Sequence, residues 1–478
     1  MKPFAPLAIA AAALAAQGAA PEPGDTVRLA LQDVLVSAMR ASPLVHVERL
    51  DVDIARRYVR ESLCAYEPDL SLSFSRETDL DHGDLGAPRT GMGLSVEQAT
   101  PGGGAIAAEA EVNRPSRTGG PRHGATTALT FTQALLQGGG LRTSLAPVRA
   151  ARLDLALRQE ELAAYAARLL ADTERAYWEL YLAMREADIR QQALDLARRL
   201  LYESEERLRV GALAPLELAS VKAEVASREK DVIDARTALD QKRYRLVYLA
   251  ADSTLLRWES AVAPGDSPGP QLPAEPLETH LAAAFELRPD LRQARLMLAK
   301  GELEVWRTRN GILPRLDFYV SLGGTSYAAT FADALTHADS GAYAVGAGFT
   351  LSAPATNGAA RQRFARARFT REQLQESIVN LERLVQLEVR SAVAETARAR
   401  QWVLAAGSAL ALQQEKLAAE QQKLAAGKST LYQVLQAQRD LTAAQLDDAR
   451  GRVGLATAVT DLHLKEGTLL EHRGVKGF

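Results

Sequence analysis

The chain has 478 residues, of which 47% are hydrophobic and 24% are charged, as in folded proteins. Its formal net charge is -2, and acidic residues are interleaved with the numerous arginines. This balance argues against nucleic acid as a partner, because phosphate binding requires a basic excess or a basic stripe. Cys64 is the only cysteine, which excludes an intramolecular disulfide.

The N-terminus has the pattern of an export signal. Lys2 precedes an apolar run, Leu7 to Ala16, and small residues follow up to Ala20. A basic start, a short apolar segment and a small-residue cleavage zone are typical of signal peptides, so we expect residues 1–20 to be removed. Beyond this leader, no apolar run reaches the roughly 18 residues of a membrane-spanning helix. If the chain crosses a bilayer, it must do so as strands of a closed barrel.

The sequence contains an internal repeat. Residues 43–72 and 289–318 align without a gap, and both segments start at a proline. The identities are Pro43 with Pro289, Arg49–Leu50 with Arg295–Leu296, Val59 with Val305, Pro68 with Pro314, and Leu70 with Leu316. Each copy predicts a helix opened by the first proline and a strand opened by the second. The same order of elements continues downstream in both halves, which indicates a duplicated unit.

The repeat sets the predicted domain boundaries. We assign the first copy to residues 21–262 and the second to residues 277–466. Between them, residues 263–276 are rich in proline and glycine and form the predicted linker. Residues 467–478 are the predicted C-terminal tail.

Six segments alternate apolar residues with polar or small ones. They are Leu70–Ser75, Met92–Glu97, Ile106–Val112, Leu129–Thr132, Leu316–Leu322 and Tyr343–Leu351. A period of two is typical of a half-buried sheet, or of a barrel wall with lipid outside and water inside. The polar stretches 78–89, 113–124 and 326–341 are predicted external loops. Six strands are fewer than the about eight of the smallest barrels, so one chain cannot close a wall alone.

Unusually long helices follow the strands. From Leu141 to about Arg209 the chain has no glycine and only Pro147 as a proline, which predicts roughly 100 Å of helix. A seven-residue apolar stripe runs along this helix, along the next one and along a helix of the second copy. Its members are Leu155, Leu162, Leu169, Ala176 and Ala183, then Leu218, Val225, Val232, Leu239 and Leu246, then Val403, Leu410, Leu417 and Leu424. An ordinary bundle core explains any one stripe, but together they predict helices supercoiled on their neighbours.

Both helical hairpins are predicted to turn at a glycine. Gly211 and Gly427 lie just past the ascending helices, where a left-handed C-cap residue is favoured. Pro215 then occupies a first-turn position of the returning helix. In the second copy, Thr430 and Gln433 have the spacing of a capping box.

These turns and the strand-to-helix corners resemble the TolC family of outer-membrane efflux proteins. Both tips show the family's pattern of a basic residue, an apolar residue, two variable positions and glycine. The two runs are Arg207-Leu208-Arg209-Val210-Gly211 and Lys423-Leu424-Ala425-Ala426-Gly427. The corners are similar to the family's Ser-Gln-Pro…Gly motif and comprise Thr132-Gln133-Ala134 up to Gly138-Gly139, and Ser352-Ala353-Pro354 up to Gly358. The first corner replaces the usual proline by Ala134, and the second lacks the glutamine.

The resemblance implies a fold that is mainly α with a β-barrel portion. The duplicated unit would combine strands with a long coiled-coil α-hairpin, and a homotrimer would form a barrel and tunnel of the TolC type. Relatives contribute four strands each to a shared barrel of twelve strands. This chain carries an extra hairpin, residues 92–112, which either joins the wall or packs as an external or luminal insertion.

The resemblance also implies a passive conduit, with its barrel in outer-membrane lipid and its helices in the periplasm. A periplasmic adaptor (a membrane fusion protein), driven by an inner-membrane pump, would dock at helical tips that gate the tunnel. The expected adaptor-contacting residues are Arg207, Leu208, Gly211, Lys423, Leu424 and Gly427. The expected barrel-to-helix corner residues are Gln133, Gly138, Gly139, Pro354 and Gly358. The tip glycines are equally explained by chain reversal alone.

Two other functions fit the same sequence. The same fold serves as the outer-membrane component of a type I protein secretion system, and a periplasmic coiled-coil scaffold without a pore is a hypothesis of a different class. We expect no enzyme, cofactor or metal site. The glycine runs 102–104 and 138–140 lack the Lys-Ser/Thr of a phosphate loop, and the seven histidines lack ligand spacing.

Overall fold

The computed structural model describes most of the chain. The described residues are 26–77, 80–81, 84–85, 89–114, 123–211, 214–250, 258, 261–269, 275–328 and 342–475. The predicted signal peptide, residues 1–20, lies outside them. The three predicted external loops also fall largely outside them, and their described residues belong to strands.

Two compact units divide the chain, and each takes segments from both copies of the repeat. Unit 1 comprises residues 1–48, 162–289 and 382–478, and unit 2 comprises residues 49–161 and 290–381. The compact units therefore do not coincide with the two sequence repeats.

The duplication extends further upstream than its sequence identity suggests. Helices α2 (Pro43–Cys64) and α7 (Pro289–Asn310) both begin at the predicted proline and both span 22 residues. They follow α1 (Leu31–Ala41) and α6 (Leu277–Leu287), which have 11 residues each. Farther upstream lie β1 (Thr26–Leu29) and β8 (Ala261–Pro264), which pair in parallel. Since β8 is a strand, the predicted linker begins inside an ordered element.

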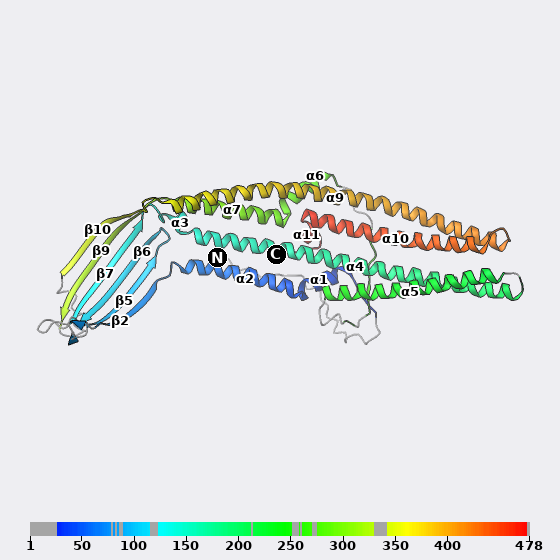
Figure 1. Ribbon diagram of the computed structural model, residues 1–478, viewed down its shortest axis with the longest axis horizontal. Helices are drawn as coiled ribbons and strands as arrows, with labels where there is room; N and C mark the ends of the chain where they lie inside the picture. The colour runs from blue at the N-terminus through cyan, green and yellow to red at the C-terminus, as the bar shows by residue number, and fades with distance from the viewer. Residues whose placement is uncertain are drawn as a thin grey trace. The chain divides into compact units, whose positions relative to one another are not determined.

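Unit 2 contains an antiparallel sheet of six strands in the order β10-β9-β7-β6-β5-β2 (Figure 1). The strands are β2 (Asp69–Glu77), β5 (Arg89–Ala99), β6 (Gly104–Arg114), β7 (His123–Ala134), β9 (Arg315–Ala328) and β10 (Ala342–Ser352). All six predicted strands are confirmed. The extra hairpin, now β5 and β6, lies inside the sheet between β2 and β7. Two short strands, β3 (Leu80–Asp81) and β4 (Asp84–Leu85), pair separately.

The register gives this sheet one apolar face and one polar or small face. One row across all six strands is entirely apolar and consists of Leu70, Val96, Ala108, Leu129, Leu322 and Val345. The next row, on the other face, consists of Ser71, Ser95, Glu109, Ala128, Gly323 and Ala344. In a single chain the apolar face is open, with Leu70 at 66% and Val345 at 76% exposure.

Four helices form two long hairpins. They are α4 (Ala146–Arg209) with α5 (Pro215–Ala250), and α9 (Gly358–Ala425) with α10 (Leu431–Glu466). The 64 residues of α4 correspond to about 96 Å at 1.5 Å per residue. The predicted helix from Leu141 is interrupted, because the short α3 (Leu141–Ser144) ends before α4 begins. Pro147 explains the break, since it lacks an N–H and restricts the residue before it.

The predicted apolar stripes pack inward. Buried members include Leu162, Leu169, Ala176 and Ala183 of α4, Val225, Val232 and Leu246 of α5, and Leu417 of α9. The other stripe residues are half-buried and none is exposed. Within the described part of the chain, no helix combines the length and the apolar character needed to cross a membrane.

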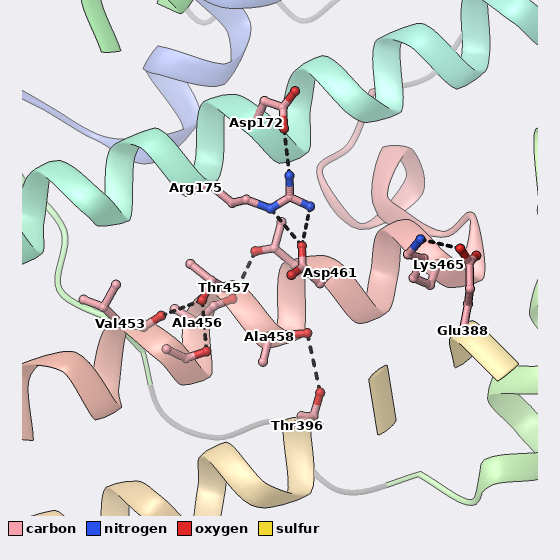
Figure 2. A network of polar contacts seen from close by, with 12 residues as sticks. Asp172, Arg175, Glu388, Thr396, Val453, Ala456, Thr457, Ala458, Asp461 and Lys465 are labelled. Atoms are coloured by element: carbon pink, nitrogen blue, oxygen red, sulfur yellow. Dashed lines mark hydrogen bonds and ion pairs between the residues drawn. The ribbon is translucent and has the colours of Figure 1, made fainter. Parts of the chain in front are cut away.

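Polar contacts hold α10 between α4 and α9 (Figure 2). The Arg175 guanidinium of α4 bonds Asp461 of α10 through Nε at 2.9 Å and Asp172 of its own helix through Nη1 at 2.7 Å. On the other side of α10, Lys465 Nζ donates to Glu388 Oε1 of α9 at 2.9 Å. Burial raises the pKa of Glu388, but Lys465 and Arg288 outweigh this and hold it below its ordinary value. Glu388 therefore stays ionised and the tie persists at neutral pH.

The structure describes residues 467–475 of the predicted C-terminal tail. It contains α11 (Leu469–His472), and the Leu469 side chain is fully buried. Arg473 forms an ion pair with Glu174 of α4, whose side chain is 2% exposed. Leu469 and Arg473 thus anchor this segment to the helical core of unit 1.

Candidate functional site

The first hairpin tip joins α4 to α5. Gly211 has φ +71°, and its N–H donates to Leu208 O at 3.0 Å, which confirms the predicted left-handed turn. Among the described residues, a side chain at this position would meet no atom within 4 Å, so the backbone conformation is the reason for glycine here. The flanking Val210 and Leu216 side chains are 74% and 80% exposed. This tip therefore presents large apolar side chains to its surroundings.

The second tip joins α9 to α10 and is held by side chains as well as by the backbone. Gly427 has φ +68°, and Lys428 N donates to Lys423 O at 2.8 Å. The predicted capping box is confirmed, because Gln433 N donates to Thr430 Oγ1 and Thr430 N donates to Gln433 Oε1, both at 3.4 Å.

A serine–glutamate bond adds to this second turn. Ser429 Oγ donates to Glu420 Oε2 at 2.7 Å, and Lys423 Nζ donates to the other oxygen of the same carboxylate at 2.7 Å. The Lys423 and Ser429 hydrogen bonds lower the pKa of Glu420. The end of α9 is thereby fixed to Ser429, which precedes Thr430, the N-cap residue of α10.

Behind the tips, the two hairpins share an apolar cluster. It consists of Leu200 from α4, Val221 from α5, and Leu431 and Leu435 from α10, with Leu201 and Leu424 packed against them. The structure therefore places the predicted tip residue Leu424 against this cluster, facing inward. Leu208 is half-buried, whereas Arg207 and Lys423 are exposed. Only part of the predicted tip set faces away from the protein.

A buried carboxylate joins the hairpins farther from the tips. The Glu224 side chain of α5 is 5% exposed and forms ion pairs with Arg228 of its own helix, at 2.8 Å, and with Arg439 of α10. Burial raises the pKa of Glu224, but the two guanidinium groups outweigh this and hold the pKa below its ordinary value. The charged form is therefore the stable one here. Sequence reasoning missed this contact, because Glu224 and Arg439 look like two of many solvated charges.

The first strand-to-helix corner lies in unit 2, and polar bonds hold it in place. Gln133 Nε2 donates to Gly102 O at 2.9 Å and to Ala134 O at 3.0 Å. Gly138 has φ +82° and donates its N–H to Asn310 Oδ1 at 2.9 Å. Asn310 ends α7 of the second copy, so one repeat holds the corner of the other. A Cβ on Gly139 would lie 2.4 Å from Ala134 O.

The second corner uses a residue that sequence reasoning missed. Asn357, not a glycine, adopts the left-handed conformation, with φ +46°, and donates from Nδ2 to Ile312 O at 2.6 Å. An asparagine just before a helix in a motif that otherwise ends in glycine is the signal that would have found it. Pro354 lies exposed in the connection, and Gly358 is the first residue of α9.

In unit 1, His280 lies near two histidines that are distant from it in sequence, His463 and His472. The imidazoles of His463 and His472 stack at 4.1 Å, and His280 Nδ1 lies 2.5 Å from Glu466 Oε1, around a cavity of about 170 Å³. Burial, followed by the charges of His472, Arg473 and His280, lowers the pKa of His463 to about 4. Among the described residues, no three His, Cys, Asp or Glu side chains are placed to hold a metal ion.

Residues 281–465 match the protein family described as "Outer membrane efflux protein". A comparison with curated protein sequences finds no match.

Solved structures resemble most of the chain. The CmeC outer membrane channel of Campylobacter jejuni has 15% identity and a TM-score of 0.70, with 92% of this chain and 86% of that chain covered. The open MtrE outer membrane channel of Neisseria gonorrhoeae has 16% identity and a TM-score of 0.68, covering 94% and 91%. The outer membrane protein VceC of Vibrio cholerae has 16% identity and a TM-score of 0.68, covering 91% and 96%. At these identities the likeness establishes the fold.

Proposed function

Since residues 281–465 match the outer membrane efflux protein family and the fold is that of outer membrane channels, we propose that the chain is a TolC-type efflux protein and that three copies of it form the outer-membrane exit duct of a tripartite efflux pump. The duct is a passive conduit. Its strands cross the outer membrane, and its long α-hairpins form a tunnel in the periplasm. A periplasmic adaptor, coupled to an inner-membrane pump, docks at the hairpin tips.

The observation that carries this proposal is the two-faced sheet with two free edges. Its apolar face suits lipid, and its polar or small face suits a water-filled lumen. Within the described strands, β2 and β10 each have a neighbour on one side only. Unpaired edge groups are too costly in a bilayer core, so the edges must pair with other copies of the chain. A periplasmic scaffold would have no use for such a sheet.

The tips supply the proposed docking surface. We assign adaptor contact to Arg207, Leu208, Gly211, Lys423 and Gly427, leave Leu424 in the apolar cluster behind the tips, and add Val210 and Leu216 because both are exposed. Burying such apolar side chains under a partner removes apolar surface from water and thereby favours the complex. The tips can also open the tunnel, since paired hairpins can shift between two packings with little loss of buried area.

The proposal is tested in a strain that depends on this protein for export. We expect the wild-type protein in the outer-membrane fraction as a detergent-stable trimer by native mass spectrometry. The double variant Val210→Asn and Leu216→Asn keeps the trimer but reduces export of pump substrates, since it removes apolar contact at an exposed tip. Ile233→Asn, an exposed apolar position on α5 away from the turn, is the matched control.

A mature protein that stays soluble without detergent would contradict the channel assignment. Full export by the tip variant would contradict docking at the first tip. If the tip variant leaves drug export at the wild-type level but abolishes protein secretion, the result would point to type I secretion instead.

A further inference from the structure

The inserted hairpin, β5 and β6, is hydrogen-bonded to the rest of the sheet along both of its outer edges. It bonds β2 on one side along Asp69 to Glu77 and β7 on the other along Gly104 to Asn113. Both of its strands have 11 residues, which matches the length of a membrane-crossing β-strand. Since β2 does not touch β7 directly in the strand order, removing the hairpin would split the sheet.

The hairpin turn is also fixed to the strand-to-helix corner. Gly140 N donates to Gly102 O at 2.9 Å, and Ala134 N donates to Gly103 O at 3.2 Å. A Cβ on Gly103 would lie only 2.4 Å from Gly138 O, so the two backbones pack too closely for any other residue. These contacts show that the hairpin is an integral part of the sheet.

The hairpin continues both faces of the sheet. Leu94, Val96 and Ala108 extend the apolar face, whereas Glu109 and Glu111 lie on the polar face. Among the described residues, neither glutamate forms an ion pair, and both are exposed. Unpaired carboxylates cannot face hydrocarbon, so this face must be in water.

The two edges fit a second copy of the same chain. The sheet has six strands, each antiparallel to its neighbours, so the edge strands β2 and β10 run in opposite directions. β2 of one copy can therefore pair antiparallel with β10 of the next, and a ring closes with no edge left over. Even strand numbers with antiparallel pairing are the rule for such barrels.

We propose that the hairpin strands line the pore, so that six strands from each of three chains close a wall of eighteen strands. This inference rests on the proposed homotrimer. Barrel diameter grows roughly linearly with strand number, and barrels of about 16–18 strands enclose an aqueous channel. Cargo crosses this section hydrated, past carboxylates that favour cations over anions.

The strand count is tested directly by electron cryomicroscopy of the purified trimer in lipid. Eighteen wall strands per trimer are expected. A trimer with twelve wall strands, and the hairpin outside the wall or inside the lumen, would overturn this inference and leave the proposed function intact. Failure to form a membrane-bound trimer would instead remove the proposed function itself.

Cysteine labelling tests which way the hairpin faces. In a Cys64→Ser background, which removes the only cysteine, single variants Glu109→Cys and Ala108→Cys are treated with a membrane-impermeant maleimide in intact outer membranes. Labelling should be about tenfold or more faster at position 109, because a thiol in hydrocarbon is neither reachable nor ionised. The neighbouring pair Ser95→Cys and Leu94→Cys repeats the test on β5 if a first variant fails to assemble.

Equal labelling at both members of a pair would overturn the inference, because a hairpin outside the wall has water on both faces. The charge is tested by reversal potentials in planar bilayers. Changing Glu109 and Glu111 to Gln should lower the preference for cations, and Ser73→Ala, an uncharged change on the same face, should not. An unchanged preference would show that the hairpin carboxylates do not face the ion path.

Discussion

The two hairpin tips are built on the same plan and present different chemistry. Both returning helices have 36 residues, and both turns use a glycine in the left-handed conformation. The second tip is closed by the capping box and by the Ser429–Glu420 bond. The first tip begins its returning helix with Pro215 and leaves Val210 and Leu216 exposed.

From this difference in chemistry we infer a division of roles between the two tips. A proline at the first helical position pre-sets the backbone and requires no side-chain acceptor. The side chains of the first tip are therefore not needed as caps, and Val210 and Leu216 form an exposed apolar surface that the proposed adaptor would cover. The second tip uses polar side chains to fix its own geometry. We expect the first tip to control adaptor affinity and the second to control the local stability of its hairpin.

The largest effect should come from separating the two hairpins. Arg439→Leu removes the cross-hairpin partner of the buried Glu224 and should cost about 2 kcal/mol, since a hydrogen bond to a buried charge is lost while Arg228 still neutralises the carboxylate. Chemical unfolding monitored by helical circular dichroism measures the loss. If the hairpins are coupled here, destabilisation will spread to both tips in hydrogen exchange.

The matched control is Lys416→Leu, which breaks an exposed pair with Asp440 between α9 and α10. Exposed pairs contribute about 0–1 kcal/mol, so its effect should be much smaller. Similar losses of stability in both variants would show that the buried Glu224 does not couple the two hairpins more strongly than an exposed ion pair does.

The next largest effect should come from the turn glycines. Val at position 427 or 211 must adopt a positive φ, which costs about 1–2 kcal/mol. Because neither position has an atom within 4 Å of an added Cβ, the cost is purely conformational. The full loss of stability is expected at Gly427, because the capping box holds its neighbours in place. A smaller loss is expected at Gly211, where the turn can adjust its backbone. Differential scanning calorimetry and export assays measure the two effects, with the trimer intact in both variants.

The sequence predicted most of this fold because its signals were local. Period-two alternation identified the strands, and Pro43 and Pro289 marked helices of equal length. The place of the extra hairpin required pairing between distant segments, namely His123–Ala134 with Gly104–Arg114, which no local pattern encodes. The same holds for Asn310, whose role depends on a corner that lies far away in the sequence.

For the candidate site, the turn glycines were predictable and the inward packing of Leu424 was not. A heptad position predicts that a leucine packs, and Leu424 was at once a stripe member and a tip residue. The structure favours the first role through its contact with the Leu200 and Leu431 cluster. The ion pair between Glu224 and Arg439 could not be predicted, because Glu224 becomes buried only when the two hairpins pack against each other.

A smaller effect is expected from the cap of the second tip. Thr430→Ala removes the hydroxyl that accepts from Gln433 N and should cost about 1 kcal/mol. Pro215→Ala is the comparison at the first tip, where no side-chain cap is lost. Thermal unfolding and hydrogen exchange of the first turns of α10 and α5 measure the two changes. Equal protection of both turns in the two variants would contradict the division between a capped tip and a pre-set one.

The smallest effect should depend on pH and concerns a hydrogen bond of the second tip, between Ser429 and Glu420. The Lys423 and Ser429 hydrogen bonds lower the pKa of Glu420 from 4.5, so their stabilisation is present above pH 4.5 and is lost as the pH falls through the lowered value. The first tip has an analogous pair, Arg209 with Glu206 at 2.6 Å, but no serine that bonds the glutamate. Ser429→Ala should therefore increase exchange at the second turn at pH 7, and this increase should shrink as the pH falls through the lowered pKa of Glu420. An increase that does not change with pH would show that the hydroxyl acts without the ionised carboxylate.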